Sequence, residues 1–320
     1  MASPSPSRLG AKIIGTGSAV PARVLTNAEL SEQVDTSDEW IVSRTGIKAR
    51  HIIQGETLVD LATGAAQKAI GSAGISAQDL DLIILATSSP DDLFGSAARV
   101  QKLLGAKRAV AFDLSAACSG FVFGLVTATQ FLRADTYQNI LLIGADVLSR
   151  WLDWSDRRTC ILFGDGAGAV VLTKATPDRV LGYELHTDGE GNDLLNLNLE
   201  LDQPSFLSMN GKEVYRFAVT AVPEVIEQAL SKAGLTIEAI DWLILHQANQ
   251  RILDAVAERL HIPSHKVISN LAAYGNTSAA SIPLALDQAI ANQQIQPGDR
   301  IMIAGFGAGL SWGAAIFYWQ

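Results

Sequence analysis

The chain repeats a short pattern of its own sequence. The segment AGISAQDLDLIILAT begins at Ala73, and AGLTIEAIDWLILHQ begins at Ala233, 160 positions later, with five of fifteen residues identical. A second pair, NILLIGA from Asn139 and RIMIAGF from Arg300, lies 161 positions apart. Two matches at almost one offset indicate an internal duplication. We therefore expect two halves of similar fold that meet near residue 175.

Each half alternates helical and strand-like segments. The segments Leu58–Ala73 and Val222–Ala233 have helical character, and each precedes a short apolar run, Leu82–Ala86 or Trp242–Leu245. These runs are apolar on both faces, as strands covered by helices on two sides require. The alternation predicts an α/β architecture, with functional residues in the loops at the strand ends.

Length and composition set the domain organisation and the compartment. A chain of 320 residues fits about two domains or one large duplicated one, and 48% apolar against 18% charged residues is typical of a folded protein. We expect a disordered tail over 1–8, a first half over 9–175 and a second half over 176–320. Two cysteines indicate a reducing compartment, the cytoplasm, or a plastid stroma if a transit peptide has been removed.

Two partner classes are disfavoured. The formal net charge of −9 argues against nucleic acid, because phosphate groups need a basic face. The stretch 301–320 has no charged residue and is the one candidate membrane span. Its glycines predict instead two short strands around a glycine loop, and so a soluble protein.

Cys118 lies where a strand leads into an apolar helix. The segment FDLSAACSG precedes FVFGLVTATQFL, which is apolar on nearly all sides and should be a buried helix. The helix N-terminus favours an anion, so we expect the dipole, worth about 0.3–2 kcal/mol, to lower the thiol pKa from about 8.5 toward neutral. Cys160 lies in the run 159–163, which reads as an ordinary buried strand, and we assign it no role.

Two candidate partners for this thiol come from the second half. His246 follows the strand-like run Trp242–Leu245, whereas the other four histidines lie among polar neighbours and are expected to be solvated. Asn276 lies in AAYGNTSAAS, before the apolar helix 282–290. Each residue alone fits a structural role, a core histidine or a turn residue. Together with Cys118 they form a Cys/His/Asn set suited to nucleophilic catalysis.

At DLSAACSGF, LHQANQR and YGNTSAAS the sequence closely resembles the β-ketoacyl-acyl-carrier-protein synthase III family of the thiolase-like superfamily. The likeness extends from TSDEWIVSRTGIKARH near residue 36 to GFGAGLSWG near residue 305. It implies the duplicated five-layer αβαβα fold, with an active site between the halves. It also implies condensation of a short acyl-CoA, most simply acetyl-CoA, with malonyl-acyl-carrier protein, giving β-ketoacyl-carrier protein, CoA and CO₂ as type II fatty acid synthesis begins.

The resemblance assigns the chemistry residue by residue. Cys118 would take the acyl group, and His246 and Asn276 would bind the malonyl thioester carbonyl. The backbone N–H groups of Cys118 and Ala308 would hold the oxyanion. An amide and a neutral imidazole can donate hydrogen bonds to the charge that decarboxylation builds on the thioester oxygen. No metal or cofactor is required, and CoA thioesters enter as substrates.

The resemblance also implies a substrate entrance and partners. Phe94 would reach across a homodimer to close the partner's acyl pocket, and Arg251 and Arg216 would dock the carrier protein. The positions that match the CoA and substrate path are Trp40, Arg44, Arg157, Asn249, Lys212, Tyr215 and Phe306.

Three other functions compete with this interpretation. The glycine-rich stretches GTGSAV at Gly15 and FGDGAGAVV at Phe163 invite a dinucleotide-binding reading, but neither combines strand, glycine turn and helix. We interpret both as tight turns between layers. A non-catalytic subunit of the same fold typically lacks the cysteine, and a thiolase places a second cysteine in a motif that Cys160 does not match.

Overall fold

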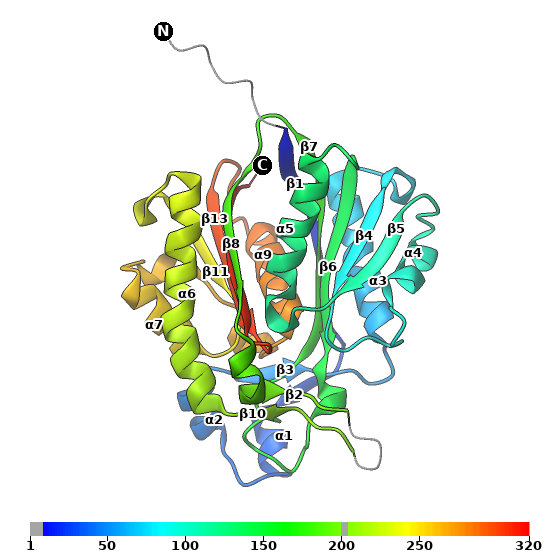
Figure 1. The fold of residues 1–320 in the computed structure, drawn as a ribbon. Coiled ribbons are helices and arrows are strands. Elements are labelled where there is room, and N and C mark those ends of the chain that lie inside the picture. Colours follow the sequence, from blue (N-terminus) through cyan, green and yellow to red (C-terminus); the bar gives the residue numbers. More distant parts are fainter. Residues whose placement is uncertain (1–8, 200–203, 320) are drawn as a thin grey trace.

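The computed structural model describes residues 9–199 and 204–319, arranged in five layers (Figure 1). Two helices lie at the centre, a sheet covers each side of them, and further helices cover the outer face of each sheet. The predicted tail over 1–8 lies outside the described residues. The α/β architecture with a duplicated αβαβα arrangement is confirmed.

The two five-stranded sheets have the same topology. In each, the strand next to one edge runs parallel to both of its neighbours, and the remaining two strand pairings are antiparallel. In order, the first sheet contains β1 (Gly10–Ala19), β7 (Asp165–Ala175), β6 (Asn139–Val147), β4 (Leu82–Ala86) and β5 (Val110–Leu114). The second contains β8 (Val180–Thr187), β14 (Ser311–Tyr318), β13 (Arg300–Gly307), β11 (Trp242–Leu245) and β12 (Val267–Ile268). The matched sequence pairs therefore occupy equivalent strands, β4 with β11 and β6 with β13.

The position of each helix follows from how much of its surface is apolar. The central pair, α5 (Gly120–Arg133) and α9 (Ser281–Ala291), is buried on most sides between the sheets. The outer helices bury one face and expose the other. They are α3 (Leu58–Ala73) and α4 (Ala97–Leu104) on the first sheet, and α6 (Gly211–Ala233) and α7 (Gln250–Arg259) on the second.

Short elements cap one end of both sheets, at the bottom of Figure 1. Thr26 and Ser37 cap the two small helices of this end through their side-chain oxygens. The elements are α1 (Asn27–Ser31), α2 (Asp38–Thr45), β2 (Val24–Thr26), β3 (Ala49–His51), β9 (Leu195–Asn196), β10 (Ser208–Met209) and α8 (Leu271–Tyr274).

The two glycine-rich stretches are parts of strands, so the prediction of tight turns is wrong. All but the last residue of the first stretch lie in β1, and all but the first two residues of the second lie in β7. A Cβ at Gly15 would lie 2.4 Å from the carbonyl oxygen of Ala69, and one at Gly168 would lie 2.6 Å from the backbone nitrogen of Leu284. Glycine is needed at both positions because helices α3 and α9 pack directly against the strand backbone.

Three further expectations need correction. Residues 159–162 form turns rather than a strand, since the backbone N–H groups of Thr159 and Cys160 bond back to Asp156. Helix α6 begins at Gly211, not at 222, and contains Pro223. His51 and His186 are half-buried and stack on aromatic rings, so they are not simply solvated.

As for a membrane, none of the helices in the described ranges is long and apolar enough to cross one.

Candidate active site

Cys118 lies in a single 3₁₀ turn, Ala117–Ser119, that connects the end of β5 to helix α5. Ala117 has a φ of +46°, a left-handed conformation that is unfavourable for a residue with a Cβ. Strain of this kind is found where the surrounding structure fixes a functional group. The Cys118 side chain is 7% exposed and lines the cavity described below.

His246 and Asn276 come from the second half. His246 directly follows β11 and is 2% exposed, and Asn276 follows α8 and is 6% exposed. A bridge between Phe163 and Asn276 ties this loop to the first half of the chain. Together with Cys118, both side chains line one cavity of about 680 Å³. The structure therefore brings together the three residues that the sequence singled out.

The expected lowering of the Cys118 pKa is wrong. Burial raises the pKa of this thiol from 9.0 to about 12, and the nearby Asp146 carboxylate acts in the same direction. One pKa unit is about 1.4 kcal/mol, so burial outweighs the ~2 kcal/mol that a helix dipole can supply at most. The hydroxyl of Ser278, whose Oγ lies 3.2 Å from Sγ, partly opposes this rise.

His246 is neutral. Burial lowers the pKa of its imidazole from 6.5 to about 3. Its Nδ1 lies 2.7 Å from Ser281 Oγ, and its ring packs edge-on against Phe306 with the centroids 5.3 Å apart. With Nδ1 in contact with Ser281, Nε2 is the ring nitrogen left for a ligand in the cavity.

The side chain of Asn276 is oriented by its own loop. Its Oδ1 accepts a hydrogen bond from the backbone N–H of Ser278 at 2.9 Å. The amide N–H groups are thus the part of the side chain left to donate. Asn276 and His246 together present neutral donors, the kind of group that stabilises a developing oxyanion.

Gly307 packs against the nucleophile. A Cβ at Gly307 would lie 2.7 Å from the backbone nitrogen of Cys118 and 3.0 Å from its Cβ. Ala308, the predicted second oxyanion residue, is partly exposed and lines a second cavity of about 850 Å³ that also reaches Cys118. This second cavity has an apolar wall, formed in part by Leu148, Trp151, Leu197 and Leu207.

The predicted entrance residues line the first cavity and none of them lines the second. Trp40 is 37% exposed, so it is not a core residue, and the guanidinium of Arg157 lies 5.1 Å from its ring centroid. The other residues predicted for the CoA and substrate path also line the first cavity, as do the two predicted for carrier-protein docking; the first group is Arg44, Asn249, Lys212, Tyr215 and Phe306, and the second is Arg216 and Arg251. The Asn249 side chain already has partners within the protein, because its Oδ1 caps α7 and its amide donates to the Arg44 carbonyl oxygen.

The entrance is basic. Six cations line the cavity and no carboxylate does, among the residues the structure describes, although the whole chain carries a net charge of −9. They are Arg44, Arg157, Arg158, Lys212, Arg216 and Arg251. Arg157, Arg158 and Arg216 pair with Asp35, Asp156 and Glu213, which lie outside the lining.

Phe94 is not part of the Cys118 cavity of its own chain. Its side chain is fully exposed, with Leu93 next to it 85% exposed, beside a separate hollow of about 490 Å³. Sequence reasoning missed Ser278, Ser281 and Gly307. The first two lie inside the motif that drew attention to Asn276, but nothing local shows which of its small residues contacts the site.

The fold and the cavity define a class of protein. The molecule has two thiolase-like halves, and one contributes a cysteine while the other contributes a histidine and an asparagine. This arrangement is that of an acyltransferase-type condensing enzyme.

Comparison with known proteins identifies the family. The family model for the 3-oxoacyl-[acyl-carrier-protein] synthase III C terminal matches residues 230–319, and the model for 3-oxoacyl-[acyl-carrier-protein] synthase III matches residues 112–189. The chain is 62% identical to the β-ketoacyl-[acyl-carrier-protein] synthase III of a Nostoc species, over 97% of this chain and 98% of that one. The chain belongs to the β-ketoacyl-[acyl-carrier-protein] synthase III family, as its motifs predict.

Solved structures agree with this assignment. The 3-oxoacyl-[acyl-carrier-protein] synthase III of Aquifex aeolicus superposes with a TM-score of 0.93 at 47% identity, covering 97% of this chain and all of that one. The priming β-ketosynthase of the R1128 polyketide pathway superposes with a TM-score of 0.95 at 33% identity, covering all of this chain and 99% of that one. The fold is thus shared by enzymes from more than one pathway.

Proposed function

We propose that this protein condenses a short acyl-CoA, most simply acetyl-CoA, with malonyl-acyl-carrier protein to start type II fatty acid synthesis. The observation that carries this proposal is the basic entrance leading to a buried Cys/His/Asn set. CoA and a phosphopantetheine-bearing carrier are anionic, and cations at a cavity mouth raise their local concentration. The two cavities that meet at Cys118 suit a thioester with one arm on each side of the sulfur.

In this proposal Cys118 attacks the acyl-CoA carbonyl and carries the acyl group. Neutral His246 and Asn276 donate to the malonyl thioester oxygen as CO₂ leaves. Backbone N–H groups of Cys118 and Ala308 hold the oxyanion when the carbanion attacks the acyl group. The remaining roles follow from position: the basic wall receives CoA and the carrier protein, and the apolar second cavity receives the acyl chain.

The proposal includes a cytoplasmic homodimer without metal or cofactor. Phe94 and Leu93 project from the chain as exposed apolar side chains, and a second copy of the chain is the partner expected to cover Phe94. Analytical sedimentation measures the oligomeric state, and we expect Phe94→Asp to shift the protein toward monomer. A wild-type monomer at working concentrations contradicts this part.

One experiment tests the reaction. Purified protein is mixed with acetyl-CoA and malonyl-carrier protein, and CO₂ release and the carrier-bound product are followed. Mass spectrometry should place an acetyl group on Cys118 and none on Cys160, which is fully buried. Cys118→Ala should lose acyl transfer while retaining some malonyl decarboxylation, and Asn276→Ala should self-acylate but not decarboxylate. No adduct from any short acyl-CoA would refute the proposal.

A further inference from the structure

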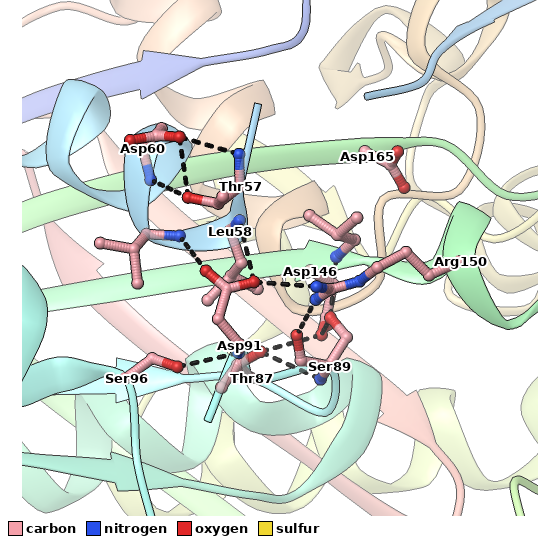
Figure 2. A network of polar contacts seen from close by, with 12 residues as sticks. Thr57, Leu58, Asp60, Thr87, Ser89, Asp91, Ser96, Asp146, Arg150 and Asp165 are labelled. Carbon is pink, nitrogen blue, oxygen red and sulfur yellow. Dashed lines mark hydrogen bonds and ion pairs between the residues drawn. The ribbon is translucent and has the colours of Figure 1, made fainter. Parts of the chain in front are cut away.

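Asp146 is a buried carboxylate close to the nucleophile. It lies near the end of β6 and is fully buried. Its Oδ1 accepts hydrogen bonds from Thr87 Oγ1 at 3.2 Å and from Ser89 Oγ at 2.8 Å (Figure 2). Oδ1 also accepts from the Ser88 N–H at 2.8 Å, and Oδ2 accepts from the Ala279 N–H at 3.1 Å. No lysine or arginine of the described residues forms an ion pair with it.

A buried charge without a counter-ion is costly. Accordingly, burial raises the pKa of Asp146 above its ordinary value of 3.8, although several hydrogen bonds act against the rise. The groups that face the carboxylate come from the loop after β4, from the turn Ser278–Ala280 and from Cys118, and none of them is positively charged. This environment suits a carboxyl group that takes up and releases a proton.

Ser278 connects Asp146 with the nucleophile. Its Oγ lies 3.2 Å from Cys118 Sγ, and its side chain also lowers the pKa of the Asp146 carboxyl, whose Oδ2 accepts a hydrogen bond from the N–H of the next residue, Ala279, at 3.1 Å. Ser278 is 1% exposed and has a φ of +52°, so the surrounding structure holds it in an unfavourable conformation. The sulfur, the hydroxyl and the carboxylate therefore lie next to one another in one buried polar cluster.

A hydroxyl has one proton and can orient in two ways. With Asp146 ionised, the hydroxyl donates to the carboxylate and the thiol donates to Oγ. With Asp146 protonated, the carboxyl donates to Oγ and the hydroxyl donates to the sulfur, which is then a thiolate. Reversing both hydrogen bonds carries a proton from Cys118 to Asp146, while the buried site keeps a single negative charge throughout.

We propose that Ser278 and Asp146 form a proton relay for Cys118, in a step that rests on the condensation proposed above. During acylation a bond forms between Sγ and the acyl carbon, the C–S bond to CoA breaks, and the thiol proton passes through Ser278 to Asp146. The CoA thiolate leaves with its electron pair and takes a proton from solvent. During condensation the acyl C–S bond breaks, the electron pair returns to Sγ, and Asp146 returns the proton through Ser278.

The relay gives the acyl-enzyme a useful charge state. Asp146 is neutral while the acyl group is attached, so no buried carboxylate opposes the negative charge that decarboxylation builds nearby. Like charges in a site of low dielectric repel strongly. His246 is not available as the acceptor in this step, because burial holds the pKa of its imidazole at about 3.

The sharpest test counts protons in the wild-type enzyme. Acetyl-CoA is added without the carrier substrate in weakly buffered solution at neutral pH, and a pH indicator is followed by stopped flow. The relay predicts uptake of one solvent proton per acyl-enzyme, because the departing CoA thiolate is protonated while Asp146 keeps the thiol proton. If the protein does not keep the thiol proton, the proton released by Cys118 equals the one taken up by the CoA thiolate, and no net uptake from solvent occurs. Zero uptake overturns the relay.

Two controls separate the possible outcomes. The acyl adduct is quantified in the same sample, so that an absent adduct refutes the proposed function and an adduct without uptake refutes the relay alone. In Asp146→Asn, the uptake should disappear, and uptake that persists there overturns the assignment to Asp146. Infrared difference spectra of the wild type should show the C=O band of a protonated carboxyl appearing on acylation. If Asp146→Asn does not fold, the presence or absence of this band shows whether a carboxyl group takes up the proton.

Substitution of Ser278 tests the connection. Ser278→Ala should slow acylation by about 100-fold, the range for loss of a general base. Its rate should rise with pH, because hydroxide must then remove the proton. Asp165→Asn is the matched control, since Asp165 is also buried and bonded to a serine, Ser149, and should acylate at the wild-type rate. An unchanged rate and pH profile in Ser278→Ala overturns the proposal.

Discussion

His246 Nδ1 lies 2.7 Å from the hydroxyl oxygen of Ser281, the first residue of the central helix α9. The same oxygen accepts a hydrogen bond from the backbone N–H of Gln247 at 3.3 Å. The imidazole is therefore oriented by a residue that the helix holds rigidly, and its other nitrogen is left for the cavity. Outer contacts of this kind fix the direction in which a histidine donates.

Removing this hydroxyl should affect one half-reaction. In Ser281→Ala the ring loses its partner, and we expect malonyl decarboxylation to fall by about 10–100-fold, as when supporting contacts of other functional histidines are removed. Self-acylation by acetyl-CoA should change little, because it does not use the imidazole. Ser281→Thr keeps the hydroxyl and serves as control. Equal losses in both half-reactions would contradict this role.

Buried neutral His246 makes stability depend on pH. Its pKa is about 3 in the folded protein and about 6.5 when unfolded, so the unfolded state binds the proton preferentially. Its contribution is therefore fully present above pH 6.5 and is lost as pH falls toward 3. The loss approaches about 1.4 kcal/mol of unfolding free energy per pH unit.

Urea unfolding measures this effect against His246→Gln, which has no titrating ring. From pH 6.5 to pH 4.5, the wild type should lose more stability than the variant, while the carboxylates common to both chains cancel in the comparison. Parallel stability curves for the two proteins would show that the imidazole titrates normally in the folded state.

Gly307 should tolerate no side chain. In Gly307→Ala the new Cβ would lie 2.7 Å from the Cys118 backbone nitrogen, so the nucleophile must move. A displacement of about 1 Å can cost roughly 100-fold in rate, and we expect acylation to fall by about that factor. Gly71→Ala in helix α3 is the control, with no atom within 4 Å of its new Cβ. It should leave the rate unchanged, and wild-type acylation in Gly307→Ala would refute the prediction.

Charge at the entrance should govern encounter with the carrier protein. Reversing an entrance cation, as in Arg251→Glu or Lys212→Glu, should raise the KM for malonyl-carrier protein by about tenfold. The effect should shrink as salt is added, because screening weakens exposed charges. Arg108→Glu makes the same change in net charge at an exposed position outside the cavity lining. A similar rise in KM for this variant would point to overall charge rather than to the entrance.

Much of the fold could be predicted from local patterns. The helix Leu58–Ala73 and the strands Leu82–Ala86 and Trp242–Leu245 have the bounds that the sequence suggested. Hydrophobic periodicity, caps and breakers act over a few residues and can be read directly. The glycine-rich strands were misread because glycine marks a turn or a close approach of two backbones equally well, and only packing against α3 and α9 distinguishes the two.

The duplication, the order of helices and strands, and the candidate cysteine, histidine and asparagine can be read from residue type and spacing. The protonation and contacts of those three groups depend instead on how the two halves pack. The contact of Ser278 with Cys118 joins residues 160 positions apart, and the Cys118 pKa rises because folding removes the thiol from water. Desolvation and contact are properties of packing, so no local stretch of sequence specifies them.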